Sequence, residues 1–137
     1  MSVSQTLLAV GAILILMNVT MTLNRSYVLA ISDTIELQND IEAIQFAQAL
    51  SESVFSLGNN PNAMVQHFGQ FNDINEPANR IEFTTALGNT LYAALDISDE
   101  ITLTHGVTGR IVTITVYSED AGQFELRAQN IISVNQR

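Results

Sequence analysis

The chain has no cysteine and no lysine among its 137 residues. The absence of cysteine excludes disulfide bonds, thiolate nucleophiles and zinc–thiolate sites. The five basic residues are all arginine and stand against fourteen acidic residues, giving a formal net charge of −9. Binding to nucleic acid needs a basic surface that neutralises phosphates. The composition therefore predicts no nucleic-acid partner.

Glycine and proline, the residues that most often interrupt helices, are absent between Gly11 and Gly58. The sequence Gly58-Asn59-Asn60-Pro61 is typical of a helix end. We therefore expect one helix from about Ser4 to Leu57, roughly 80 Å long at 1.5 Å per residue. A helix of that length needs neighbours to cover it.

Charged residues are absent from Met1 to Asn24. The apolar run from Val3 to Leu23 would be about 31 Å long as a helix, close to the hydrocarbon thickness of a bilayer. A cleavable signal peptide is less favoured, because it would begin with a basic residue and end in a small-x-small site. Polar residues gather in the second half of the run, so membrane insertion is favourable by a small margin. We expect this segment to lie in a membrane or in the core of a fibre.

Beyond Arg25 the apolar residues recur at helical spacing with acidic residues between them. One such group is Val28, Ile31 and Ile35, and a later one is Ala43, Ala47, Leu50, Val54 and Leu57. The apolar stripe drifts around the helix axis, so more than one face is apolar. The expected organisation is an apolar half-helix over residues 1–25, an amphipathic half over 26–58 and a small globular head over 59–137.

The head is expected to begin with helices. Pro61–Phe68 suits a short helix with Asn60 as N-cap and Gly69 as its stop. Residues 70–80 are polar and suit a loop. The spacing of the apolar residues in Ile81–Leu95, such as Leu87 and Leu91, predicts a further helix packed on the core.

The end of the chain predicts a three-stranded antiparallel meander. The strands are expected over Glu100–His105, Arg110–Tyr117 and Gln123 to about Ser133, with turns at 106–109 and 119–122. The second half of the long helix would cover one apolar face of the sheet. The fold class is therefore α+β, a long N-terminal helix packed on a small C-terminal antiparallel sheet. The residues expected on the covered face are Ile101, Leu103, Val112, Ile114, Val116, Phe124, Leu126 and Ala128.

This order of elements, a helix that is apolar and then amphipathic followed by a loop and a small sheet, resembles the type IV pilins and pseudopilins. The likeness covers the whole chain in architecture and about Met1 to Leu57 in sequence character. The family's basic leader and its glutamate five residues into the mature chain are not seen, which implies an outlying branch of the family or convergence on the same design. Counted from Met1 or Ser2, Gln5 or Thr6 takes the place of that glutamate. We expect either that Met1 is already the processed end or that export differs.

In that family the apolar half-helix anchors the subunit in the cytoplasmic membrane and then packs with its copies as a fibre core. The resemblance implies a structural subunit that forms a homo-oligomeric extracellular filament at the cell surface and needs no cofactor. Gln5 and Arg25 either mark the two ends of the apolar span or contact a neighbouring subunit. The residues expected between copies are Gln5, Leu7, Leu8, Val10, Ile13, Leu14, Leu16, Met17, Arg25, Val28, Ile31 and Ile35.

Other candidate sites are weaker. His67 and His105 lie in different expected elements without a second ligand at metal spacing, so structural or surface roles are favoured. The acidic pairs at 99–100 and 119–120 suit solvated turns better than calcium sites. The sequons beginning at Asn18 and Asn24 allow a surface glycan on Asn24, because Asn18 lies inside the apolar run. No catalytic constellation is seen, so we expect a protein that is not an enzyme.

A second hypothesis fits the same residues. The chain could be a single-pass membrane protein whose acidic head serves as an accessory or binding module of a secretion or envelope complex. It would then stay monomeric or dimeric in detergent and form no fibre.

Overall fold

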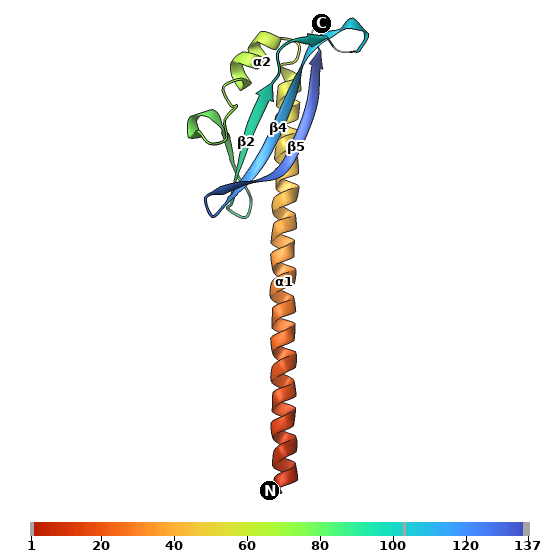
Figure 1. Cartoon of the computed structure of the whole chain (residues 1–137), viewed down its shortest axis with the longest axis vertical. Coiled ribbons are helices and arrows are strands. Elements are labelled where there is room, and N and C mark those ends of the chain that lie inside the picture. The colour runs from red at the N-terminus through yellow and green to blue at the C-terminus, as the bar shows by residue number, and fades with distance from the viewer. Residues whose placement is uncertain (1, 103, 136–137) are drawn as a thin grey trace. The chain divides into compact units, whose positions relative to one another are not determined.

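The computed structural model describes residues 2–102 and 104–135. A long helix comes first and an antiparallel sheet follows, so the predicted α+β class is confirmed (Figure 1). The elements are α1 (Val3–Ser56), α2 (Pro61–Phe68), the 3₁₀ turns η1 (Pro77–Asn79) and η2 (Thr104–Gly106), and the strands β1 (Ile81–Thr84), β2 (Thr90–Ile97), β3 (Ile101–Thr102), β4 (Thr108–Asp120) and β5 (Gln123–Asn135).

The chain divides into two compact units, Met1–Gln38 and Asn39–Arg137. We call them the N-terminal unit and the head. The N-terminal unit consists of the first two-thirds of α1. The head contains the last part of α1, residues 39–56, together with α2 and the sheet.

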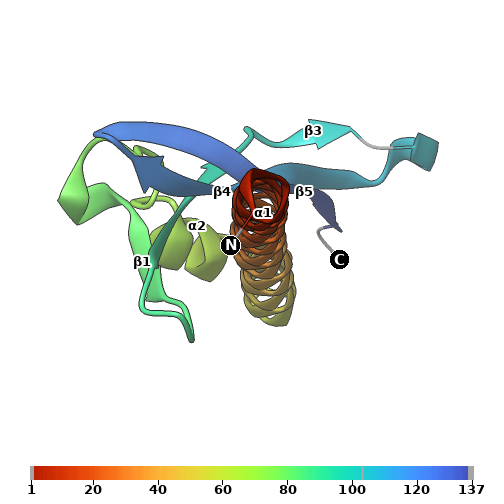
Figure 2. The ribbon, with the colours of Figure 1, turned by 90° about the horizontal axis from the view of Figure 1, so that it is seen from below.

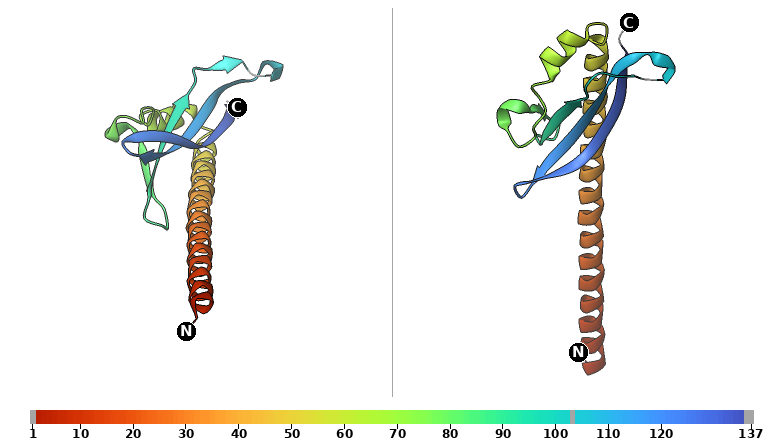
Figure 3. Two further views of the ribbon diagram at one scale, coloured as in Figure 1. Left: turned by 60° about the horizontal axis from the view of Figure 1, so that its bottom comes forward. Right: turned by 45° about the horizontal axis from the view of Figure 1, so that its top comes forward.

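The five strands form one antiparallel sheet. Strand β1 pairs with β2, and β2 pairs with β4. The short β3 also pairs with β4, and β5 lines the opposite edge of β4 over its whole length. The two long strands are joined by a tight turn at Ala121 and Gly122, both with positive φ, which suits the twist of a hairpin (Figure 3). The predicted strands at 110–117 and 123–133 are therefore confirmed, and both are longer than expected.

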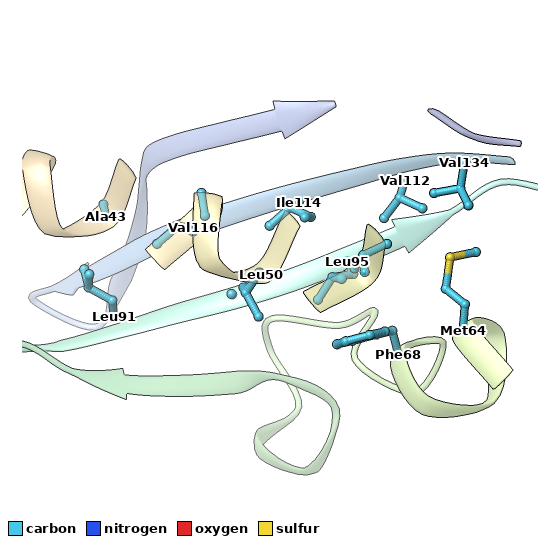
Figure 4. Packing of buried hydrophobic residues seen from close by; sticks show 13 residues of the cluster. Ala43, Leu50, Met64, Phe68, Leu91, Leu95, Val112, Ile114, Val116 and Val134 are labelled. Atoms are coloured by element: carbon cyan, nitrogen blue, oxygen red, sulfur yellow. The ribbon is translucent and has the colours of Figure 1, made fainter. Parts of the chain in front are cut away.

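Residues 39–56 of α1 cover one face of this sheet, as expected (Figure 2). Ala43, Ala47, Leu50 and Val54 follow the spacing of a single helix face, and all four are buried. Two of the four are alanines, whose small side chains let a helix approach a sheet closely. Side chains of β2 and β4 meet this helix face, and α2 closes one end of the core with Met64 and Phe68 (Figure 4). The strand residues in this core are Leu91, Ala93, Leu95, Val112, Ile114, Val116 and Val134.

Polar contacts complete the junction between α1 and β5. The hydroxyl of Ser51 donates to the carbonyl of Ala47 at 2.9 Å and accepts from the side-chain amide of Asn130 at 3.0 Å. Because Ser51 is buried, these two bonds satisfy a hydroxyl that would otherwise destabilise the core. The helix ends at Ser56, one residue before the expected end at Leu57. A Cβ at Gly58 would lie 2.9 Å from Cγ1 of Val134, so glycine permits this close approach.

The short helix α2 is confirmed with the predicted residues. Its N-cap Asn60 accepts a hydrogen bond from the backbone N–H of Ala63 at 3.2 Å, and Pro61 occupies the first turn. The backbone N–H of Gly69 bonds the carbonyl of Val65 at 2.8 Å and ends the helix. The sequence signals for a cap, a first turn and a stop are all used here.

The prediction of a helix over Ile81–Leu95 is wrong, because these residues form β1 and most of β2. Gly88 has a φ of 86° in the turn between them, and the backbone N–H of Thr85 bonds the carbonyl of Asn89 at 2.7 Å. The buried residues Leu91, Ala93 and Leu95 alternate with more exposed ones, the period of a strand. The predicted helix rested on Phe83, Leu87, Leu91 and Ala94, and the first three are spaced by four residues. An alternating strand satisfies a spacing of four as well as a helix does.

The first strand of the predicted meander is also shorter than expected. Glu100–His105 contains only the two-residue β3, and His105, with a φ of 67°, lies in the turn η2. Ile101 is not part of the buried core. Leu103, expected on the covered face, lies outside the described residues.

Two residues of β5 lie on the face opposite to the one predicted. Val116 is opposite Ala128, whereas Tyr117 is opposite Leu126, so Arg127 is an extra residue in β5. Such a bulge reverses the alternation of side chains. Ala128 packs against the core as predicted, whereas Leu126 and Phe124 do not.

The bulge also places Arg127 beside α1. Its Nη1 lies 3.3 Å from a carboxylate oxygen of Asp40, and its Nε donates to the hydroxyl of Ser118 at 2.8 Å. Arg127 also pairs with Glu125 of its own strand at 3.2 Å. The irregularity in β5 is therefore the point at which this strand forms an ion pair with the helix.

Leu95→Ala should lower the free energy of unfolding of the head by about 2–5 kcal/mol, because Leu95 is fully buried and truncation leaves a cavity. Urea unfolding of the detergent-solubilised chain, followed by tyrosine fluorescence, measures this change. The matched control is Ile131→Ala on β5, where the side chain is 67% exposed and the expected change is within about 0.5 kcal/mol. Equal unfolding midpoints for the two variants would contradict the described core.

Candidate functional site

The N-terminal unit carries an apolar surface that the chain itself does not cover. No residue from Ser2 to Gln38 is buried, although most of the segment is aliphatic. Leu8 is 74% exposed and Ile15 is 66% exposed. In a protein that stays in water, such side chains would be inside a core. This uncovered segment of α1 is the candidate functional site (Figure 1, red to orange).

The segment has the length and composition of a membrane-spanning helix. An 18-residue window within α1 reaches a mean hydropathy of 2.1, and none of that window is buried. By these two criteria the helix could cross a bilayer. A signal sequence near an N-terminus meets the same criteria, so length and composition do not by themselves decide between them.

All twelve residues predicted to lie between copies are in this segment, and all are exposed. They do not form one stripe, because the apolar residues surround the helix. Leu7 and Leu8, for example, are adjacent in sequence and point about 100° apart around the axis. The uncovered surface therefore suits several neighbours at once better than a single partner.

Gln5 has a local role that we did not predict. Its side-chain oxygen accepts from the backbone N–H of Ser2 at 3.3 Å, and its own backbone N–H donates to the hydroxyl of Ser2 at 3.3 Å. This reciprocal pair is a capping box with Ser2 as N-cap, and it satisfies two backbone donors at the start of α1. The motif Ser-x-x-Gln was the signal in the sequence. Among the described residues, Ser2 is the hydrogen-bond partner of the Gln5 side chain, and no bond joins it to another helix or strand.

Hydroxyl groups in the apolar half bond their own helix. The Thr22 hydroxyl donates to the carbonyl of Asn18 at 2.9 Å, and the Thr6 hydroxyl donates to the carbonyl of Ser2 at 3.2 Å. Such bonds leave fewer unsatisfied donors for an apolar environment. The polar residues of the span are thus less costly to bury than their number suggests.

The first charged side chain, that of Arg25, lies directly after the uncharged residues 1–24. Arg25 is exposed, and within the described part of the chain it has neither an ion pair nor a side-chain hydrogen bond. The same holds for Asp33, the next charged residue along α1. No described residue of the N-terminal unit forms an ion pair with the Arg25 guanidinium or with the Asp33 carboxylate.

The head offers no assembled catalytic or metal site among the residues that the structure describes. No group of three or more histidine or acidic side chains could hold a metal ion there. His67 is exposed and makes an edge contact with the ring of Phe68, with 4.7 Å between ring centres. It borders an open hollow of about 530 Å³ between the end of α1 and α2, lined by Ser53, Ser56, Leu57, Ala63, Gln66, His67 and Phe68. This lining has no carboxylate or cysteine, and the prediction that the chain is not an enzyme stays a prediction.

The sheet face opposite α1 carries a cluster of an arginine and aromatic rings that we did not predict. The guanidinium carbon of Arg80 lies 4.3 Å from the ring centre of Tyr92 and 5.7 Å from that of Phe124. Arg80 also pairs with Glu82 at 3.0 Å, and the Tyr92 hydroxyl donates to Glu119 at 3.3 Å. Partial burial, and then the bond to Glu119, raise the pKa of Tyr92. The cluster satisfies its own charges, which favours a structural role.

Comparison of the chain with protein-family models, with curated proteins and with solved structures finds no match. The long helix and the small antiparallel sheet are compatible with a pilin-like fold. No match assigns the chain to that family.

The raised pKa of Tyr92 predicts a pH dependence of stability. The unfolded chain loses the phenol proton near pH 10, whereas the folded chain holds it to higher pH, so the stabilisation is fully present below about pH 10. It is then lost as pH rises through the folded-state value. Urea unfolding at a series of pH values between 8 and about 11.5 should show this fall, and Tyr92→Phe should flatten it. The matched variant Tyr117→Phe keeps Tyr92 and should keep the fall; identical profiles for the two variants would contradict the assignment.

Proposed function

We propose that the chain is a structural subunit that polymerises through the N-terminal unit into an extracellular, pilus-like filament. Before assembly the same helix anchors the subunit in the cytoplasmic membrane. The observation that carries the proposal is the apolar segment 3–23, in which no side chain is buried by the chain itself.

The free energy available from covering this surface is large. Full burial of one leucine, isoleucine or valine side chain contributes about 1.5–3 kcal/mol. The segment has apolar side chains on all sides, so a single flat partner would leave much of it in water. A bilayer covers every side, and so does a bundle of copies of the same helix. This supports one surface that serves first in the membrane and then in a fibre.

The head supports the proposal by being complete without the N-terminal unit. Its core is formed by residues 43–134, and its polar residues and acidic charge suit exposure to water. A subunit of this design keeps its fold while its apolar helix passes from lipid to protein neighbours.

The second candidate is a single-pass membrane protein whose acidic head is an accessory module of a secretion or envelope complex. The hydropathy of α1 supports it equally, because a lone spanning helix also needs no cover from its own chain. The two proposals differ in what happens outside the membrane. Only the filament subunit assembles into a polymer of one chain.

Immunogold labelling of the head, with negative-stain microscopy of material sheared from cells, tests the filament directly. We expect uniform fibres labelled along their length, in addition to a membrane pool of single chains. An absence of labelled fibres, together with monomers or dimers in detergent, would favour the accessory module. Mass spectrometry of the N-terminus adds an independent test: loss of the first twenty or so residues would remove the proposed fibre core and contradict the proposal.

Leu14→Asp should abolish fibre formation, because it places a charge in the middle of the apolar segment at a cost of about 3 kcal/mol for insertion alone. The amount of chain in membranes and in sheared fibres measures the effect. Gln45→Asp is the matched control, because it adds the same charge to an exposed position of α1 beyond the apolar segment. Normal fibres from Leu14→Asp would show that this segment is not in the core.

A further inference from the structure

The first two charged residues of the chain are Arg25 and Asp33, and both lie in the N-terminal unit. Arg25 is the only basic residue of that unit. The two are eight residues apart, so their Cα atoms differ by about 12 Å along the helix axis. Residues contact each other along one helix at a spacing of three or four. These two opposite charges are thus too far apart to pair within one copy.

We propose that neighbouring copies pack in parallel with an axial offset of about eight residues, so that Arg25 of one copy pairs with Asp33 of the next. This inference rests on the proposed function, since it concerns the contact between subunits of a filament. The occupant of the uncovered helix surface is thereby a second copy of this chain, recognised by charge at this level of the helix.

The apolar residues alone would not set this offset. They surround the helix, and sliding one copy along another exchanges one aliphatic contact for a similar one. A charge excluded from water behaves differently, because it is costly unless an opposite charge meets it. Burying Arg25 between helices therefore favours the one register that supplies a carboxylate. Charges at such positions determine partner and register more than they determine total affinity.

Two other arrangements fit these charges less well. In parallel copies without an offset, Arg25 would face Arg25 and Asp33 would face Asp33, so like charges would repel. In an antiparallel pair centred on Leu29, both ion pairs could form, but the apolar segments 3–23 would point away from each other and stay uncovered. Parallel packing with an offset covers those segments and also pairs the charges.

The offset also explains how the contact could make a polymer. A contact between two different surfaces of identical subunits repeats without closing when each step includes a translation. At about 100° per residue, Arg25 and Asp33 lie about 80° apart around α1 and so occupy different faces. Glu36, by contrast, lies within about 20° of Arg25 around the axis, on the same face. Asp33 is therefore the acidic residue placed to receive the arginine of a neighbour.

Cysteine crosslinking tests the offset, and the native chain has no cysteine to interfere. Leu29 and Leu37 lie one turn beyond the two charged residues, are 56% and 59% exposed, and keep the same eight-residue spacing. In filaments of Leu29→Cys/Leu37→Cys, oxidation should give a ladder of disulfide-linked multimers on a denaturing gel. Leu29→Cys and Leu37→Cys alone should stay monomeric. Dimers from Leu29→Cys alone would indicate an unstaggered or antiparallel contact and would overturn the inference.

Charge reversal tests the ion pair itself. Arg25→Glu and Asp33→Arg should each lower the yield of filaments about tenfold or more, because each leaves an unpaired or repelled charge in the contact. A mixture of the two single variants in one cell should assemble, because Glu at 25 in one copy then meets Arg at 33 in the other. Rescue by mixing is specific to a contact between copies. The double variant Arg25→Glu/Asp33→Arg should also assemble.

Neutral substitutions supply the matched control. Asp33→Asn should lower the filament yield more than Glu36→Gln, although each removes one exposed acidic charge from the same helix. The membrane pool of each variant, measured separately, shows whether insertion has changed. If wild-type filaments form and the reversed variants assemble equally well, the inference is wrong while the proposed function stands. If the wild-type chain forms no filament, the proposed function fails.

Discussion

The helix surface that the chain does not cover is the constraint on which the rest of this protein depends. Residues 2–38 include no buried side chain, and the first 24 residues contain no charge. Water is an unfavourable environment for such a helix, which supports the proposal that a bilayer and then neighbouring copies surround it. Residues 39–56 of the same helix, by contrast, pack on one face of the sheet. One continuous helix thus has two parts: residues 2–38, which the chain leaves uncovered, and residues 39–56, which pack in the core of the head.

The packing that the chain does complete depends on small residues and on one irregularity. Ala43 and Ala47 let α1 approach the sheet, and Gly58 lets the end of the helix region pass Val134. The bulge at Arg127 then turns β5 so that its inner side chains reach the core while Arg127 meets Asp40. The head therefore holds the C-terminal part of α1 by apolar contacts and by an ion pair. In the filament that we propose, these contacts within the head would not depend on what surrounds residues 2–38.

Much of the fold could be predicted because helix signals in this sequence are local. The lack of glycine and proline between Gly11 and Gly58 predicted the C-terminal end of α1 to within a residue, and Asn60 and Pro61 predicted α2. Ile81–Leu95 could not be assigned correctly because a spacing of four satisfies both a helix and an alternating strand. The pairing of β2 with β1 and with β4 decides between them, and the pairing with β4 is a long-range contact. The bulge at Arg127 was unpredictable for the same reason: the residues of β5 alternate acceptably in either register.

The candidate site, like the fold, has features that depend on neighbouring residues in the sequence and features that do not. Its apolar character is a property of composition, so the sequence was sufficient to identify it. The capping role of Gln5 is also a local property, because it depends on Ser2 three residues earlier in the motif Ser-x-x-Gln. The apolar half contains no ionisable side chain, and the neutral amide of Gln5 already bonds Ser2 within its own helix. In the filament that we propose, the leucines and isoleucines of this half would supply the free energy of association, and any charge-based specificity would come from residue 25 onward. The proposed filament would thus separate the strength of association, in the first 24 residues, from the choice of register, in the residues that follow.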